Sequence, residues 1–169
     1  MKNKYICILI MGVAGCGKTS IGSLLAKKIN AFFIEADNFH GKANIKKMSS
    51  GNPLNDEDRY GWLLKIKKEI IKRNSKQNLV VACSSLKESY RDILDKNNFK
   101  LVYLKISKEL ATTRINSRSD HFMPGSLVDS QFLILEEPKD AIIFNQDLTE
   151  KQTVDRIIKE LELEIEIEL

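Results

Sequence analysis

Short apolar runs alternate with amphipathic helical patterns along this 169-residue chain. The first run, Lys4 to Met11, is almost continuously apolar, which is typical of a strand buried on both faces of a sheet. Four more short runs follow, each separated from the next by a segment long enough to hold a helix. These patterns predict five strands, at residues 4–11, 31–35, 79–83, 101–106 and 141–145.

The segments between the runs carry apolar residues three and four positions apart, as helices do. Asp56 is placed to cap the helix that carries Trp62 and Ile66, and Thr149 with Gln152 has the pattern of a capping box. Strands that alternate with helices indicate right-handed βαβ units, so we expect an α/β fold with a parallel sheet covered on both faces. The predicted helices lie at 18–29, from 56 onward, around 85–94, at 108–118, just before Pro138 and after Thr149.

Length and charge describe one basic domain. A chain of 169 residues is of ordinary domain size and has no linker-like stretch, so residues 1–169 are expected to form a single domain. Lys and Arg number 27 against 23 Asp and Glu, and five glutamates lie within the last ten residues, so the rest of the chain is strongly basic. A basic body favours an anionic partner. Without a cluster of stacking aromatic residues or a basic helix, we expect that partner not to be nucleic acid.

The cysteines and the N-terminus indicate where the protein works. Cys7, Cys16 and Cys83 form no CxxC pair, so neither a disulfide framework nor a zinc site is expected, and a cytoplasmic location follows. Lys2 and the apolar run ending at Cys16 also resemble a lipoprotein signal peptide. We reject that interpretation because the same segment opens a nucleotide-binding motif. No other apolar run reaches the roughly 18 residues of a membrane span, and no membrane partner is expected.

Residues 12–19 read GVAGCGKT and match the P-loop pattern GxxxxGK[ST] between a buried strand and an amphipathic helix. Its glycines let the backbone N–H groups face phosphates, and the helix N-terminus adds positive potential. Lys18 is expected to reach the β- and γ-phosphates of ATP, and the Thr19 hydroxyl to ligate Mg²⁺. The motif predicts a P-loop NTPase with three αβα layers. Its expected nucleotide-binding residues are Gly12, Val13, Ala14, Gly15, Cys16, Gly17, Lys18 and Thr19.

The acidic residue that usually follows strand three of such folds is absent, because the run at 79–83 ends in Cys83-Ser84. Glu35 and Asp37 follow the second strand instead, two residues apart and therefore on one face if the strand extends that far. The carboxyl ends of parallel strands are where such folds bind ligands. We therefore expect Glu35 and Asp37 to assist Thr19 with the metal, the alternative being two solvated loop acids.

Five segments carry a resemblance to a known family. Residues 37–59 resemble the GDxLHPxxNxxKMxxGxPLxDxDR stretch of the gluconokinase family, a branch similar to shikimate and nucleoside monophosphate kinases. The chain departs from that stretch at Ala36 and Gly41, and at Gly61 just beyond it, without losing a charged side chain. The resemblance implies an ATP-dependent gluconokinase that makes 6-phospho-D-gluconate. The other four segments are 11–19, 83–92, 118–124 and 130–138.

The resemblance also implies roles for residues outside the P-loop. Asp37 would be the general base on the sugar-acid hydroxyl, and Arg59 would bind the carboxylate unless it forms a helix-surface ion pair with Asp56 or Glu57. Arg114 would pack on adenine, and Arg118 would reach the phosphates as a catalytic group with Asp37 and Lys18. The predicted substrate-binding residues are Asp37, His40, Asn44, Arg59, Ser84, Lys87, Arg91 and His121.

The resemblance implies a substrate-binding insertion at 39–75 and a lid at 119–126.

Lys87 and Arg91 are expected on one helix face toward the cleft if that helix begins near Ser85. The alternative for Arg91 is a solvent-exposed charge without a binding role. A homodimer is a further expectation. Two other functions stay open: a kinase of another hydroxy-acid such as shikimate, which would carry a Gly-rich tip where this chain has Ser84-Ser85, and a P-loop regulator without transfer.

Overall fold

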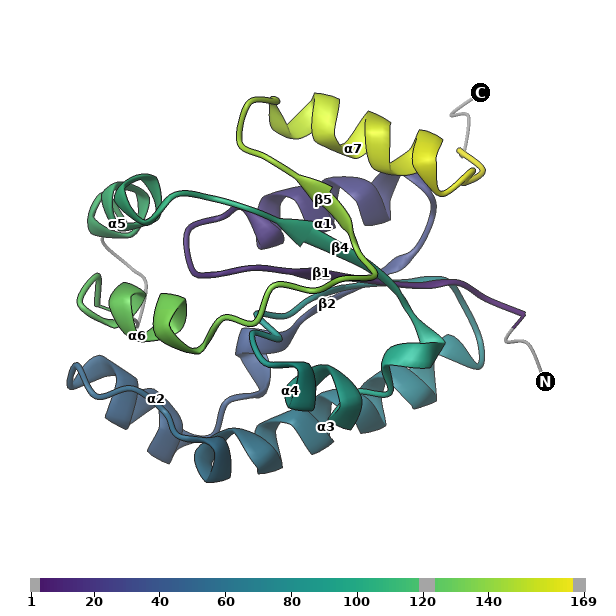
Figure 1. The fold of residues 1–169 in the computed structure, drawn as a ribbon. Helices are drawn as coiled ribbons and strands as arrows, with labels where there is room; N and C mark the ends of the chain where they lie inside the picture. The colour runs from purple at the N-terminus through teal and green to yellow at the C-terminus, as the bar shows by residue number, and fades with distance from the viewer. Residues whose placement is uncertain (1–3, 119–123, 166–169) are drawn as a thin grey trace.

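The computed structural model describes residues 4–118 and 124–165. One parallel sheet of five strands runs through the molecule in the order β2-β3-β1-β4-β5, with β1 at its centre (Figure 1). This confirms the predicted α/β fold, although each strand is shorter than the apolar run that predicted it. The strands are β1 (Cys7–Met11), β2 (Phe32–Glu35), β3 (Leu79–Ala82), β4 (Lys100–Leu104) and β5 (Ile142–Phe144).

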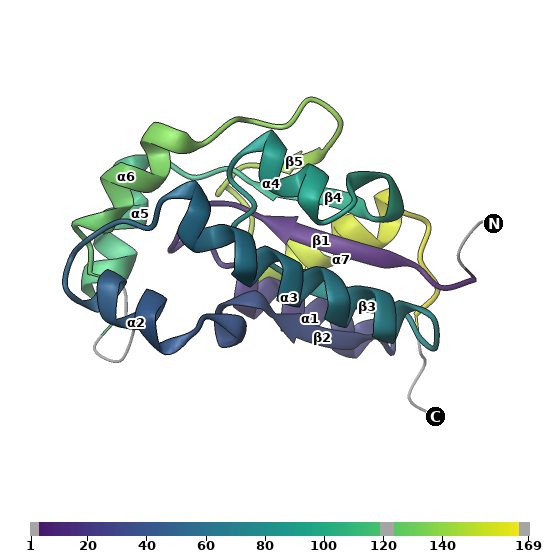
Figure 2. The ribbon, with the colours of Figure 1, turned by 90° about the horizontal axis from the view of Figure 1, so that it is seen from below.

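Helices cover both faces of the sheet, which makes the predicted three-layer αβα sandwich. The helices α1 (Lys18–Lys28) and α7 (Glu150–Glu160) pack together on one face. On the other face lie α3 (Asp56–Asn74) and α4 (Glu88–Ile93), as the view in Figure 2 shows. Among the described residues, no helix has the length and apolarity that crossing a bilayer requires.

The central strand explains why the sequence shows no alternation there. Ile8 and Ile10 belong to the hydrophobic cluster under α1 and α7, whereas Leu9 and Met11 belong to the cluster under α3 and α4. All four side chains are fully buried. A strand covered on both faces needs apolar residues at successive positions.

The remaining helices gather beyond the carboxyl ends of the strands (Figures 1 and 2). They are α2 (Lys42–Ser49), α5 (Lys108–Asn116) and α6 (Leu127–Ile134). Two short 3₁₀ turns complete the fold, Ala36–Phe39 directly after β2 and Lys96–Asn98 just before β4. The helix α2 was not predicted, because Met48 is its only buried residue and the helix therefore has almost no apolar periodicity to detect.

Three local predictions need correction or are confirmed. Asp56 is the first residue of α3, and Asn55 is its N-cap, since the Asn55 side chain accepts the Asp58 N–H and Asp58 completes a capping box. The strand β2 stops at Glu35, so Asp37 lies in the following 3₁₀ turn instead of on the same strand face. The capping box of Thr149 and Gln152 at the start of α7 is confirmed.

Candidate active site

The P-loop joins β1 to α1 through a backbone that only glycine accommodates at its tightest points. Gly12 has φ 150°, and a Cβ atom there would lie 2.8 Å from the Leu104 carbonyl oxygen. Gly17 has φ 96° and is the N-cap of α1. The loop therefore ends directly at a helix N-terminus, whose N–H groups have no helical partners and favour an anion.

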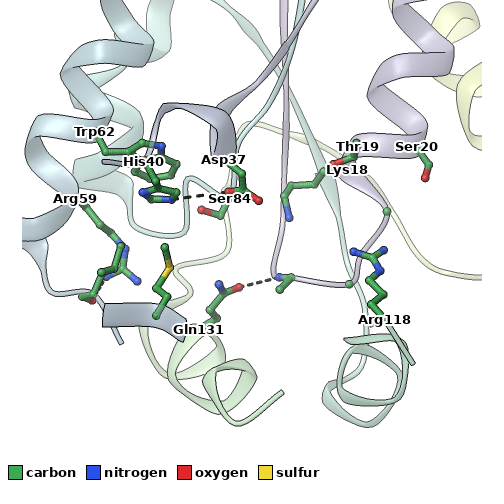
Figure 3. Close-up of a pocket in the computed structure, with 15 residues that line it drawn as sticks. Lys18, Thr19, Ser20, Asp37, His40, Arg59, Trp62, Ser84, Arg118 and Gln131 are labelled. Carbon is green, nitrogen blue, oxygen red and sulfur yellow. Dashed lines mark hydrogen bonds and ion pairs between the residues drawn. The ribbon is translucent and has the colours of Figure 1, made fainter. Parts of the chain in front are cut away.

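The first two residues of α1 bring a cation and a hydroxyl to the loop. The Lys18 ammonium lies back over the loop and donates a hydrogen bond to the Val13 carbonyl at 3.1 Å. The Thr19 hydroxyl donates to Glu35 at the end of β2. Both side chains line a cavity at this edge of the sheet, which we call the central cavity (Figure 3). The predicted phosphate ligands thus stand together at the carboxyl end of the sheet.

A second hollow continues from the P-loop on the side of α5 and β5. Arg114 donates to the Gly15 carbonyl at 3.2 Å and to the Gln146 side-chain oxygen at 2.8 Å, and Gln146 donates to the Cys16 carbonyl at 3.4 Å. Arg114, Gln146 and Arg118 line this hollow together with Phe144. Gln146 was not predicted as a site residue, although its place shortly after the last strand is a signal that could have identified it.

The central cavity adjoins the P-loop and is lined by side chains from widely separated segments (Figure 3). Arg118 borders both the cavity and the second hollow, so it lies between the two. Gln131 of α6 accepts the Ala14 N–H at 2.7 Å and was not predicted. The lining residues beyond the P-loop are Ser20, Asp37, His40, Met48, Leu54, Arg59, Trp62, Ser84, Arg118 and Gln131.

Glu35 accepts the hydrogen bond of the Thr19 hydroxyl, and Asp37 lines the same cavity as Thr19. Besides the Thr19 hydroxyl, Glu35 accepts the backbone N–H of Asp37 at 3.3 Å, and burial raises its pKa above the ordinary glutamate value. Among the described residues, no three His, Cys, Asp or Glu side chains cluster as a metal site. One hydroxyl and one or two carboxylates are the set that Mg²⁺ takes beside nucleotide phosphates.

His40 forms one wall of the cavity. Its ring stacks on Trp62 with centroids 4.3 Å apart, and the Trp62 indole N–H donates to the Ala36 carbonyl at 2.8 Å. The Nε2 atom of His40 lies 3.9 Å from an Asp37 carboxylate oxygen. Burial lowers the pKa of His40 to about 4, so the ring is neutral near pH 7. From the sequence, Trp62 was placed only among the apolar residues of the predicted helix, yet it also supports this wall.

Arg59 also faces the cavity and is not held in the ion pair that was its alternative. Its guanidinium donates to the Leu54 carbonyl and, at 3.4 Å, to the Tyr90 hydroxyl. Asp56 is bound instead by the Lys87 ammonium at 2.8 Å. The pKa of Asp56 lies below its ordinary value mainly because of that hydrogen bond.

Three predicted substrate ligands lie outside the cavity lining. Arg91 is 5% exposed and donates to three backbone carbonyls, those of Ser85, Leu86 and Glu136. The expected shared helix face does not form, because α4 begins only at Glu88. Arg91 is therefore a buried tie between loops.

Lys87 pairs with Asp56, and Asn44 donates to the Asp58 carbonyl at 2.9 Å. Both side chains are thus engaged in packing α2 and α4 against the start of α3. Ser84 does line the cavity, whereas His121 lies outside the described residues.

Comparisons with known proteins assign the family. The model of the family described as shikimate kinase matches residues 14–162. A probable gluconokinase of Dictyostelium discoideum is 38% identical, over 95% of this chain and 86% of its own length. The thermosensitive gluconokinase of Escherichia coli is 43% identical, over 78% of this chain and 72% of its own. The chain belongs to the gluconokinase family.

Solved structures agree with this membership. A gluconokinase from Sinorhizobium meliloti is 32% identical, covers 96% of this chain and 98% of its own, and superposes with a TM-score of 0.77. An unliganded sugar kinase from Janibacter reaches a TM-score of 0.86 at 33% identity, covering 94% of this chain and 95% of its own. The resemblance inferred from the five sequence segments is thereby confirmed.

Proposed function

We propose that this protein transfers the γ-phosphoryl group of ATP to the primary hydroxyl of D-gluconate, giving 6-phospho-D-gluconate and ADP. The observation that carries the proposal is one cavity in which the P-loop residue Lys18 faces Asp37 and Arg59. Membership of the gluconokinase family supports the choice of acceptor. The product is a sugar-acid phosphate, and this places the enzyme in carbohydrate acid metabolism.

Asp37 and the cationic side chains divide the work of transfer. Asp37 accepts the proton of the acceptor hydroxyl. At the same time, the hydroxyl oxygen forms a bond to the γ-phosphorus, and the bond between the γ-phosphorus and the β-phosphate oxygen breaks. Lys18 and Arg118 neutralise the charge on the transferring group. Phosphoryl transfer needs an oriented nucleophile more than a strong base, which suits a carboxylate that is 40% exposed.

The far wall of the cavity would bind the sugar acid. Arg59 offers a planar fork to the carboxylate, and neutral His40 offers a ring nitrogen to the polyol hydroxyls. Ser84 adds a hydroxyl from the end of β3. Trp62 makes the wall rigid, because its stacking and its hydrogen bond to Ala36 fix the His40 ring.

ATP is the phosphoryl donor of this kinase family, and the residues present fit a Mg²⁺ ion beside it. Thr19 would hold the ion, with Glu35 and Asp37 near it, and all three supply the hard oxygen donors that Mg²⁺ prefers. The bound ion supplies charge that neutralises the β- and γ-phosphate oxygens. Glu35, with its raised pKa and its hydrogen bond to Thr19, would orient that hydroxyl.

Several further assignments stay predictions. Residues 119–126 would close as a lid and exclude water; of these, 119–123, including His121, lie outside the described residues. Residues 39–75 would form the acceptor-binding insertion. A cytoplasmic location, a homodimer and the absence of a nucleic-acid partner are proposed with the function.

A coupled assay of ADP release tests the proposal. We expect release that depends on D-gluconate and Mg²⁺, with shikimate, glucose and nucleoside monophosphates near background. A preference for shikimate would make the protein a kinase of another hydroxy-acid. If nucleotide binds but no acceptor stimulates ADP release, the protein would be a P-loop regulator.

A further inference from the structure

The side chain of Tyr90 joins the charged residues that border the acceptor end of the cavity. Tyr90 is 3% exposed, and its hydroxyl donates to an Asp56 carboxylate oxygen at 2.5 Å. The same hydroxyl accepts a hydrogen bond from the Arg59 guanidinium at 3.4 Å. The guanidinium carbon lies 5.6 Å from the centre of the Tyr90 ring. A single phenol therefore touches Arg59 with both its oxygen and its ring.

Asp56 is kept from Arg59 by a second partner. Lys87 donates to both Asp56 carboxylate oxygens, at 2.8 and 3.1 Å, and the Tyr90 hydroxyl donates a further hydrogen bond to the same carboxylate. An arginine beside a free carboxylate forms a two-point ion pair, as the sequence alone would allow for Arg59. Here the Asp56 charge is already satisfied, so the guanidinium stays available to the cavity.

The charges of this group leave room for one anion. Arg59 and Lys87 carry two positive charges, and Asp56 carries one negative charge. The neighbouring Asp58 is occupied by Lys47 at 2.5 Å and by the capping box of α3. The surplus positive charge therefore lies on Arg59, at the cavity wall.

We propose that Tyr90 is a positioning residue that holds the Arg59 guanidinium in the orientation that accepts the carboxylate of the substrate. The inference rests on the proposed function, in which that carboxylate belongs to a sugar acid. Tyr90 is absent from the cavity lining and thus acts through Arg59. Its hydroxyl is suited to the task because donation to Asp56 turns an oxygen lone pair toward Arg59.

The test is Tyr90→Phe, which removes one oxygen and keeps the ring. We expect the KM for gluconate to rise roughly five- to tenfold, the effect of one lost hydrogen bond, with kcat and the KM for ATP nearly unchanged. Tyr103→Phe is the matched control. Tyr103 is 2% exposed, and its hydroxyl donates a hydrogen bond of 3.3 Å to Glu137. Tyr103 is not among the residues that line the cavity. This control should keep wild-type kinetics, and thermal unfolding compares the folding of both variants.

A double variant asks whether Tyr90 acts through Arg59. In an Arg59→Lys background, Tyr90→Phe should add almost nothing to the loss of gluconate affinity. An equal loss in both backgrounds would overturn the proposal, as would a fall in kcat without a change in KM. Wild-type kinetics of Tyr90→Phe would overturn it as well.

Calorimetric binding of gluconate gives a readout that is independent of transfer. Tyr90→Phe should weaken gluconate binding relative to both the wild type and Tyr103→Phe. A wild type that binds gluconate in this Tyr90-dependent way but never phosphorylates it would contradict the proposed function and leave the inference standing. A wild type that binds no gluconate, or equal binding by wild type and Tyr90→Phe, would overturn the inference.

Discussion

The two halves of the cavity are built in opposite ways. The nucleotide half is built around one contiguous segment, residues 12–19, whose backbone is shaped by glycines. The acceptor half is assembled from side chains in and just after the 3₁₀ turn, on α3 and just after β3. Backbone N–H groups bind any phosphate, whereas separate side chains must each be aimed by their neighbours. Under the proposed function, the nucleotide half therefore holds the phosphoryl donor, and the acceptor half supplies the base and selects what is phosphorylated.

Substitutions in the two halves should consequently differ in kind. A change at the P-loop should lower transfer to every acceptor by the same factor. A change at the acceptor wall should alter the ranking of acceptors while ATP binding is kept. The first three of the four predictions below test that division, and the fourth tests the burial of a residue in the acceptor half; they run from the largest expected effect to the smallest.

Lys18→Ala should lower kcat about a thousandfold or more, because its ammonium stabilises charge on the γ-phosphoryl group. The ADP-release assay measures the loss, and circular dichroism confirms that the fold is kept. Lys28→Ala is the matched control, since Lys28 lies in the last turn of α1 and pairs with Asp155 at 2.5 Å. Near-wild-type turnover of Lys18→Ala would remove the P-loop from the mechanism.

Asp37→Asn should lower kcat by roughly two or more orders of magnitude, because asparagine neither accepts the proton nor aligns the hydroxyl as a carboxylate does. ATP affinity, measured by calorimetry, should stay within about twofold because Thr19 and the P-loop are intact. Asp155→Asn, at an exposed site on α7, serves as the control. If only the KM for gluconate changed, Asp37 would be a binding residue.

Arg59→Lys keeps the charge but loses the planar fork. The kcat/KM for gluconate should therefore fall by a factor that corresponds to about 2–3 kcal/mol of lost transition-state stabilisation. Glucose has no carboxylate, and the gap between gluconate and glucose should narrow in the variant. Arg73→Lys is a control on the same helix, because Arg73 pairs with Glu69 at 2.6 Å. An unchanged ratio of gluconate to glucose would place the carboxylate site elsewhere.

His40 predicts a pH dependence of stability. Burial lowers its pKa to about 4 from the ordinary value of 6.5, so protons bind the unfolded chain more tightly than the folded one. The stabilising contribution is complete above about pH 6.5 and is lost as the pH falls toward 4; the loss should be about 2–3 kcal/mol.

Denaturant unfolding between pH 7 and 4.5 measures this loss against a His40→Gln variant. As the pH is lowered, the free energy of unfolding should fall more steeply in the wild type than in the variant, because glutamine does not titrate. Parallel pH profiles for the two proteins would show that the histidine is not buried as described.

The contrast between the halves also explains how far sequence reasoning reached. The P-loop, the alternation of strands and helices along the chain apart from α2, and the capping box at Thr149 depend on short-range patterns, and all three could be predicted. The family motif supplied Asp37, His40 and Arg59 as acceptor residues, and the fold brings them to one cavity.

What escaped prediction depends on tertiary contacts. Arg91 has the charge of a ligand, but only the packed structure turns it toward three carbonyls. The helical spacing of Trp62 indicates only that the residue lies on the apolar side of its helix. It does not indicate that the His40 ring stacks on the indole. Gln131 contacts a P-loop residue that precedes it by more than a hundred positions, a distance that no local pattern spans.

Phosphorus-31 NMR of the wild-type reaction with ATP, Mg²⁺ and D-gluconate tests the central claim most directly. The claim predicts a new phosphate monoester on the terminal hydroxyl of gluconate that accumulates in step with ADP, and a far slower reaction when glucose replaces gluconate. Inorganic phosphate as the only product besides ADP, or glucose phosphorylated as fast as gluconate, would contradict it.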